Sequence, residues 1–293
     1  MAGFIDTIRF RFKSGDILIK LLFINIGIFL LTGVISVVCT LFNLPTPDIR
    51  RWTGVPSNIA ELLLHCWTLL TYMFIHADFW HILFNMLMLY CFGRLFLNYF
   101  NPKNMGGLYV LGGLVGALLY VVAFNTIPYY IGMGNRQMIG ASASVMAIIF
   151  AAAFYCPQQK VMLFLFGGIK IVYIACLIFV ADFLELANLD NPGGHVAHIG
   201  GAIMGYLFAK QYAKGKDLTA GLNKLLDCLV DIFRPRHRPL KVKYKKPETD
   251  YEYNQRKYRE TEDIDNILDK IKASGYSSLT KEEKKRLFDA SNK

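Results

Sequence analysis

Long apolar runs separated by short polar segments dominate the first 212 residues of the chain. A helix needs about 20 mostly apolar residues to cross about 30 Å of hydrocarbon, and residues 21–42 meet this requirement without a charged side chain. Five further apolar runs are predicted to be spans, with boundaries near residues 77–97, 105–125, 138–155, 168–188 and 195–212. The pattern predicts an all-α, polytopic membrane protein with six transmembrane helices.

Charged residues are concentrated in the last third of the chain. Residues 210–293 hold 21 of the 32 Lys and Arg residues and 14 of the 22 Asp and Glu residues. This division argues against a compact soluble globule and against a wholly disordered chain. The six cysteines are scattered without a C-x-x-C pair, so neither a disulfide scaffold nor a zinc knuckle is indicated.

Four polar side chains lie inside the predicted spans at a similar depth. The second, fourth and sixth spans run in the same direction, and His81, Ser142 and His198 lie 13, 14 and 12 residues before Arg94, Cys156 and Lys210 near the inner ends of these spans. At 1.5 Å per residue this is about 18–21 Å. Asn85 lies one turn after His81 on the same helix face. A lone membrane serine usually bonds to its own backbone, but polar groups at matched depth predict a shared site.

Small residues follow the candidate serine and the candidate histidine. Ala143 and Ala147 follow the serine at a four-residue spacing, and Gly201 and Gly205 follow the histidine at the same spacing. Small side chains let two membrane helices approach closely. An imidazole must come within about 3 Å of a hydroxyl to take its proton, so this spacing is compatible with a catalytic pair as well as with ordinary packing.

Three short motifs occur in order along the six predicted spans: His81-Ile-Leu-Phe-Asn85, Gly140-Ala-Ser142 and Ala197-His198-x-x-Gly201-x-x-x-Gly205. Each motif alone is weak, but the ordered set resembles the rhomboid family of intramembrane serine proteases. The resemblance covers about residues 15–212. It implies a six-helix rhomboid-like bundle.

The resemblance also implies a role for each polar residue. Ser142 matches the nucleophile, and His198 matches the general base and acid. His81 and Asn85 match the pair that stabilises the oxyanion, and His76 matches a further histidine often found in the family. The implied activity is an intramembrane serine endopeptidase that uses no metal and no cofactor. Its expected substrates are membrane-anchored proteins, cut within their transmembrane segments near the outer face.

The chain departs from the family pattern at three positions. Ala143 replaces the second glycine of Gly-x-Ser-Gly, Met146 stands where an aromatic residue often lies, and Thr68 replaces an arginine that usually follows Trp67. A thioether packs against an imidazole ring, so we expect Met146 to change the orientation of the histidine only slightly.

No third catalytic carboxylate is indicated by the sequence. Asp182 and Glu185 lie near the outer end of the fifth predicted span. We interpret both as surface groups, which favours a Ser–His dyad over a triad.

Three alternatives remain open. A membrane zinc protease would use His76, His81, His195 and His198, but the chain has no H-E-x-x-H motif and its spans lack paired carboxylates. A non-catalytic rhomboid-like protein would handle membrane proteins without cutting them. A transporter would place half-helices around Gly-rich breaks.

The distribution of basic residues predicts the orientation in the membrane. With the N-terminus inside, the inner segments up to residue 224 hold twelve Lys and Arg residues and the outer loops hold three. Both termini are therefore expected in the cytoplasm, with the active site open to the external side. The C-terminal region resembles a module of some bacterial rhomboids, so we expect a bacterial cytoplasmic membrane.

The residues after the spans are predicted to form two further segments. Residues 213–256 begin with an amphipathic helix and contain a basic run, 234–246, with seven Lys and Arg residues. Anionic lipid is the expected partner of this run, since each basic residue near a membrane contributes about 1 kcal/mol; nucleic acid is not expected as a partner. Residues 257–293 show an apolar stripe and a Thr280–Glu283 capping box, which predicts a small cytoplasmic helical hairpin. The oligomeric state is left open.

Overall fold

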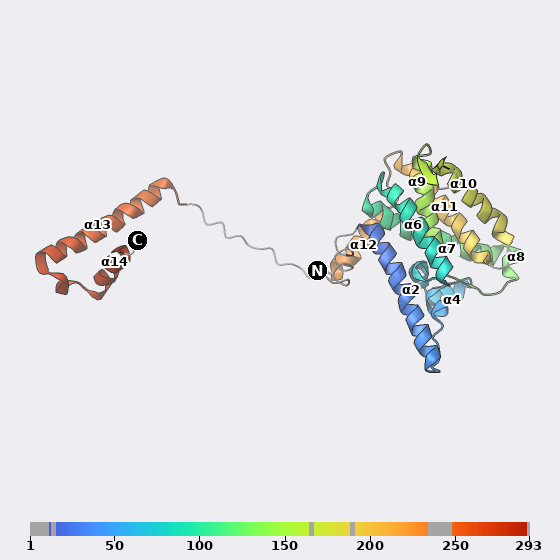
Figure 1. The fold of residues 1–293 in the computed structure, drawn as a ribbon, viewed down its shortest axis with the longest axis horizontal. Helices are drawn as coiled ribbons and strands as arrows, with labels where there is room; N and C mark the ends of the chain where they lie inside the picture. The colour runs from blue at the N-terminus through green and yellow to red at the C-terminus, as the bar shows by residue number, and fades with distance from the viewer. Residues whose placement is uncertain (1–11, 13–15, 164–166, 188–190, 234–247, 292–293) are drawn as a thin grey trace. The chain divides into compact units, whose positions relative to one another are not determined.

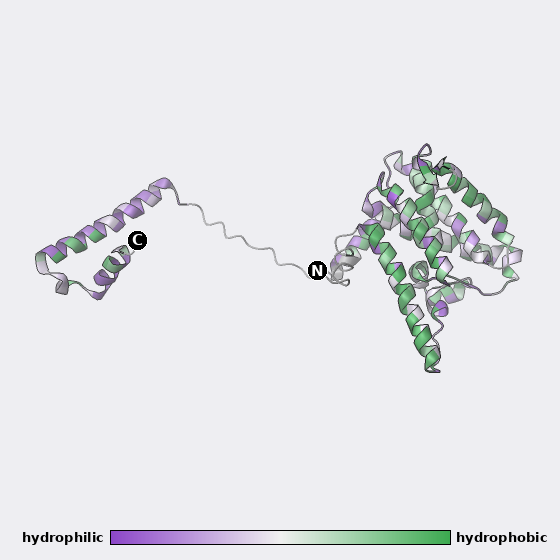
Figure 2. Ribbon diagram, in the orientation of Figure 1, coloured by the Kyte–Doolittle hydropathy of each residue, from purple (hydrophilic) through white to green (hydrophobic). Residues whose placement is uncertain are grey.

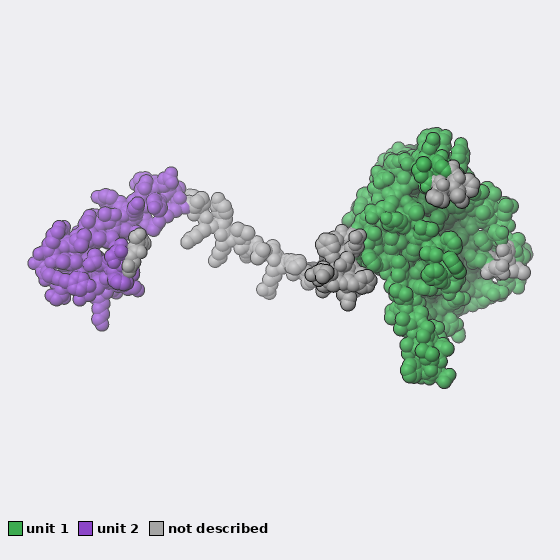
Figure 3. Space-filling view, in the orientation of Figure 1, with its two compact units in different colours: residues 1–234 green, residues 235–293 purple. Residues whose placement is uncertain are grey.

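The computed structural model describes residues 12, 16–163, 167–187, 191–233 and 248–291. The chain divides into two compact units, residues 1–234 and residues 235–293 (Figure 3). The basic run 234–246 lies outside the described residues. Its contact with anionic lipid therefore stays a prediction.

A helix lies at each of the six predicted spans in the larger unit (Figure 1). These helices are α2 (Ile17–Leu41), α6 (Phe79–Leu97), α7 (Pro102–Thr126), α9 (Ser142–Tyr155), α10 (Ile171–Leu184) and α11 (Pro192–Tyr212). By length and composition, α2, α6 and α7 are long and apolar enough to cross a membrane, and α9 is a shorter apolar helix. The expected all-α membrane bundle is confirmed, whereas the number of spans stays a prediction.

The exposed side of α2 is apolar along most of its length (Figure 2). Its outward side chains include Leu30, Leu31, Val34, Val37 and Val38. A continuous apolar face of this size is not tolerated against water in a soluble protein. It is the surface expected of a helix that contacts lipid.

Helix α9 forms the centre of the bundle, because every residue from Ala143 to Ala153 is buried. Helix α11 lies against it so closely that a Cβ atom added at Gly201 would overlap the carbonyl oxygen of Ala143. A Cβ atom at Gly205 would overlap the carbonyl oxygen of Ala147 in the same way. The two backbones therefore touch over two turns, with the small residues at the four-residue spacing seen in the sequence.

Short elements in the connections close one end of the bundle. The connection between α2 and α6 contains α3 (Ile49–Thr53), β1 (Val55–Pro56), α4 (Ile59–Leu64), α5 (Thr68–Thr71) and the 3-10 turn η1 (Tyr72–Phe74). Strand β1 pairs antiparallel with β2 (Gln137–Met138), which lies just before α9. The Tyr72 hydroxyl donates to the Gly113 carbonyl at 2.6 Å, and this bond ties η1 to α7.

The other connections between the six helices are shorter. They hold α8 (Pro128–Ile131), the antiparallel pair β3 (Lys160–Leu163) and β4 (Gly167–Lys170), and the 3-10 turn η2 (Glu185–Ala187). After α11, the amphipathic helix α12 (Ala220–Phe233) packs on the start of α7. There the Asn104 amide donates to Asp217 at 2.8 Å and to Thr219 at 3.0 Å. This polar anchor fixes where α12 begins.

The smaller unit is a helical hairpin made of α13 (Asp250–Ser274), the 3-10 turn η3 (Tyr276–Ser278) and α14 (Lys281–Ser291). Its first helix begins before the expected start at residue 257, because Thr249 and Glu252 form a capping box there. Ile267 and Leu279 are buried between the helices, and the Lys270 ammonium donates to Glu283 at 2.9 Å.

The contact between α9 and α11 predicts a loss of stability on substitution of Gly201. A methyl group at this position meets the Ala143 backbone, which has no flexible end to move. We expect Gly201→Ala to lower the free energy of unfolding by about 1–3 kcal/mol, measured by thermal unfolding in detergent. Gly33→Ala in α2 is the control, because nothing lies within 4 Å of its added Cβ atom. Equal unfolding temperatures for the two variants would contradict the close contact.

The hairpin is expected to loosen in acid. The Lys270 ammonium and the Thr280 backbone N–H lower the pKa of Glu283 to about 2. Because the folded pKa lies below the unfolded value of about 4.3, the stabilisation is fully present above that value and is lost as pH falls towards about 2. We expect the amide protection of α14, corrected for intrinsic exchange, to fall between pH 5 and pH 3. Glu283→Gln should remove this dependence, whereas Glu282→Gln should keep it.

Candidate functional site

The candidate serine begins a helix directly after a glycine in a conformation that other residues rarely adopt. Ser142 is the first residue of α9, and Gly140 has a φ of +128°. A Cβ atom at Gly140 would lie 2.8 Å from His81 Nε2 and 3.6 Å from Ser142 Oγ. The absent side chain therefore leaves the space in which the imidazole of His81 and the hydroxyl of Ser142 approach each other.

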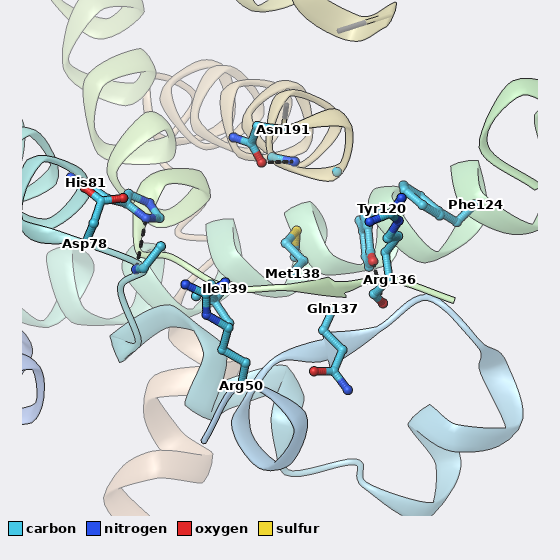
Figure 4. Close-up of a pocket in the computed structure, with 13 residues that line it drawn as sticks. Arg50, Asp78, His81, Tyr120, Phe124, Arg136, Gln137, Met138, Ile139 and Asn191 are labelled. Carbon is cyan, nitrogen blue, oxygen red and sulfur yellow. Dashed lines mark hydrogen bonds between the residues drawn. The ribbon is translucent and has the colours of Figure 1, made fainter. Parts of the chain in front are cut away.

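The start of α6 holds His81 in a defined orientation. Asp78 caps the helix by accepting the His81 backbone N–H at 3.0 Å, and the Ala77 backbone N–H donates to His81 Nδ1 at 3.4 Å (Figure 4). Since Nδ1 accepts, the hydrogen of the neutral ring is assigned to Nε2. His81 therefore presents an N–H donor on the side of Gly140 and Ser142.

Asn85 lies one turn below His81 and is buried. Its side-chain amide donates to the His81 carbonyl oxygen at 2.8 Å. An amide nitrogen carries two hydrogens, so this bond fixes the side chain and leaves a second donor. His81 and Asn85 thus form one rigid pair of donors on one face of α6.

Helix packing brings the candidate serine and histidine to the same level. Ser142 immediately precedes Ala143, whose carbonyl oxygen lies against Gly201, and His198 lies three residues before Gly201 on the same face of α11. Both side chains are partly buried. The contact between α9 and α11 is therefore the geometric basis for a Ser–His pair.

Asp182 is not a surface group, and its interpretation as one is wrong. Its side chain is buried on α10, and its Oδ1 atom lies 2.8 Å from His198 Nδ1 and 2.9 Å from His195 Nδ1. Glu185, by contrast, is exposed. The sequence places Asp182 near a helix end but does not show that α10 turns this residue towards α11. The signal that was missed is the pair of histidines three residues apart, both facing an acidic residue in an apolar run.

His76 lies beside His81, with ring centroids 5.1 Å apart. It is buried, and within the described parts of the chain neither of its ring nitrogens has a hydrogen-bond partner. The four histidines considered as zinc ligands from the sequence do not meet at one site. The cluster of metal-ligand size in the described residues joins His195 and His198 with Asp182, and it includes neither His76 nor His81.

A cavity of about 480 Å³ opens beside His81 and Asp78 (Figure 4). Its walls come from the starts of α6 and α11, the end of α7 and the segment around β2. Arg50 and Arg136 line it together with Asp78, His81 and Tyr120. A lining of this kind can hold water and a polar peptide backbone beside His81, which a purely apolar cleft cannot.

The positions that depart from the family pattern have ordinary local roles. Met146 is buried one turn after Ser142. The Thr68 hydroxyl donates to the His65 carbonyl at 2.7 Å, and the Trp67 indole N–H donates to the Trp52 carbonyl at 2.9 Å. Neither Trp67 nor Thr68 lines the cavity beside His81.

Comparison with known protein families matches residues 64–214 to the rhomboid domain and residues 248–293 to a family of unknown function, DUF6576. Among curated proteins, the chain is 28% identical over 169 residues to RHOMBOID-like protein 12, mitochondrial, of Arabidopsis thaliana, covering 55% of this chain and 50% of that protein. It is 27% identical over 146 residues to Rhomboid protein 1, mitochondrial, of Saccharomyces cerevisiae, covering 48% and 40%. It is 24% identical over 187 residues to the human presenilin-associated rhomboid-like protein, mitochondrial, covering 59% and 46%. The chain thus spans half or less of the length of these relatives.

The expected location in a bacterial cytoplasmic membrane is contradicted by these relatives. All three carry the word mitochondrial in their names. The error came from the C-terminal hairpin, because a resemblance to a module of bacterial proteins does not determine the compartment of the membrane domain.

The geometry around Gly140 predicts that this residue controls the reactivity of Ser142. Gly140→Ala combines backbone strain at φ +128° with a methyl group 2.8 Å from His81 Nε2. Strain of this kind costs about 1–3 kcal/mol, so we expect labelling of Ser142 by a fluorophosphonate to slow at least about tenfold. Gly134→Ala is the matched control, since its φ is +68° and its added Cβ atom meets nothing within 4 Å. Equal labelling rates in both variants would contradict a role for this space.

Proposed function

This chain belongs to the rhomboid family, and on that premise we propose that it is an intramembrane serine endopeptidase. Ser142 is the proposed nucleophile and His198 the proposed general base and acid. The proposed substrates are membrane-anchored proteins that are cut within or beside a transmembrane segment.

The observation that carries this proposal is the juxtaposition around Gly140. The hydroxyl of Ser142 lies at a helix N-terminus, a neutral imidazole presents its Nε2 atom beside it, and α11 brings His198 to the same level. A packing serine needs none of these neighbours. A nucleophile needs a base, and its oxyanion needs donors that are already in place.

In the first step, His198 takes the Ser142 proton as Ser142 Oγ attacks a substrate carbonyl carbon. The negative charge develops on the carbonyl oxygen, where backbone N–H groups at the start of α9 and the donors of His81 and Asn85 stabilise it. The helix dipole also favours negative charge at this end. His198 then gives its proton to the leaving amine, and an acyl-enzyme remains.

In the second step, water attacks the acyl-enzyme. His198 takes a proton from that water and returns it to Ser142 Oγ as the new carboxylate leaves. The cavity of about 480 Å³ beside His81 is the proposed route for this water. It also offers space for an unwound stretch of substrate, because a peptide bond in an intact helix hides its carbonyl carbon from a nucleophile.

Replacement of the serine tests the proposal directly. We expect Ser142→Ala to lower cleavage of a membrane-anchored reporter by about 10⁴-fold or more, because the attacking oxygen is removed. Ser144→Ala is the control: Ser144 lies on the same helix, is buried, and has no hydrogen-bond partner among the described residues. It should retain cleavage. Unchanged cleavage by Ser142→Ala would reject Ser142 as the nucleophile, whereas no cleavage by the wild-type protein would favour a role in handling membrane proteins without cutting them.

A further inference from the structure

A carboxylate is buried against two histidines at the core of the site. Asp182 Oδ1 lies 2.8 Å from Nδ1 of His198 and 2.9 Å from Nδ1 of His195. The two histidines are three residues apart, so they face the same way on α11. Helix α10 is otherwise strongly apolar, with Ile171 and Ala175 as its other buried residues.

A charge in such a place needs a compensating partner. Burying an unpaired carboxylate costs several kcal/mol, and acidic residues inside membrane helices are rare and mostly functional. Here the carboxylate contacts imidazole nitrogens, and its second oxygen, Oδ2, is buried without a partner among the described residues. The interaction with the two histidines is therefore what compensates the charge of Asp182.

We infer that Asp182 is a positioning residue for the base, so that Ser142, His198 and Asp182 act as a triad, with His195 holding the same carboxylate oxygen as His198. This inference rests on the proposed protease function. It assigns Asp182 a role that the Ser–His dyad expected from the sequence does not include.

The hydrogen-bond chemistry supports this role. An ionised carboxylate only accepts hydrogen bonds, so the Nδ1 atom of His198 must carry the hydrogen that binds Asp182. The lone pair of the neutral ring is then on Nε2, the atom that takes the serine proton in a Ser–His–Asp arrangement. When the ring becomes imidazolium, the negative charge 2.8 Å away stabilises it.

His195 supports the carboxylate rather than the reacting atoms. It shares the Oδ1 atom with His198, which fixes Asp182 between two donors. Loss of His195 would leave the carboxylate with a single partner and free to rotate. We therefore expect His195 to affect the rate only through the position of Asp182.

A metal at this cluster is the competing interpretation. The ligand atoms of Asp182, His195 and His198 lie within 4.8 Å of one another. A cation would bind the Nδ1 lone pair of His198 and force its hydrogen onto Nε2. That arrangement removes the base, so the metal and the triad are mutually exclusive during catalysis.

The experiment measures kcat and KM of the purified full-length protein in lipid vesicles with a membrane-anchored reporter. Asp182→Asn is the central variant, because an amide oxygen can still accept from both Nδ1 atoms while the negative charge is lost. We expect kcat to fall by about 10²- to 10⁴-fold with little change in KM, and Asp182→Ala to be at least as slow. Asp48→Asn is the control, since Asp48 caps α3 and asparagine caps equally well.

A second pair of variants separates positioning from general destabilisation. His195→Asn keeps a nitrogen near the place of Nδ1 and should retain most of the wild-type kcat, whereas His195→Leu should lower it at a similar unfolding temperature. If Asp182→Asn and Asp182→Ala keep the wild-type kcat, or change KM alone, the inference is overturned. The inference is also overturned if a chelator abolishes activity and Zn²⁺ restores it.

The test distinguishes this inference from the function on which it rests. Cleavage by Ser142→Ala at the wild-type rate would reject Ser142 as the nucleophile and with it the serine mechanism on which the triad rests. An inactive Ser142→Ala together with fully active Asp182 variants would leave the protease in place and reject only the triad.

Discussion

The backbone contact between α9 and α11 is the constraint on which the rest of the site depends. Gly201 and Gly205 lie directly on the carbonyl oxygens of Ala143 and Ala147. Apolar side chains cannot drive helices together in lipid as they do in water, so packing of this closeness is what holds such a pair. Residues with larger side chains would separate the helices and move His198 away from Ser142, whatever the chemistry of either residue.

His81 and His198 lie at a similar depth, but different hydrogen-bond partners hold their neutral rings in opposite tautomers. The Ala77 backbone N–H occupies Nδ1 of His81 as a donor, so Nε2 of His81 is itself a donor. The Asp182 carboxylate occupies Nδ1 of His198 as an acceptor, so Nε2 of His198 is left as an acceptor. Stabilising an oxyanion requires the first pattern and removing a proton requires the second. The proposed roles of His81 and His198 thus differ because the backbone and α10 supply different partners.

The sequence predicted the helices and the residues of the candidate site better than it predicted which other residues contact that site. Depth counting and small-residue spacing use only the rise of a helix, and they singled out Ser142, His198 and Gly201. Neither depth counting nor small-residue spacing shows how a helix is rotated about its axis, so Asp182 was interpreted as a surface group. The pairing of β1 with β2 was also missed, because strands of two residues carry no alternating pattern.

The Asp182 carboxylate links α10 to α11. Between α9, α10 and α11 lies an apolar cleft of about 340 Å³, lined by residues such as Phe150, Phe179 and Tyr206. Among the described side chains of α10, Asp182 makes the polar contacts with α11, whereas Ile171 and Ala175 are buried at the other end of the helix. Any movement of α10 away from α11 must lengthen the bond from Asp182 to His198. The orientation of His198, the proposed base, therefore depends on the docking of α10 against α11.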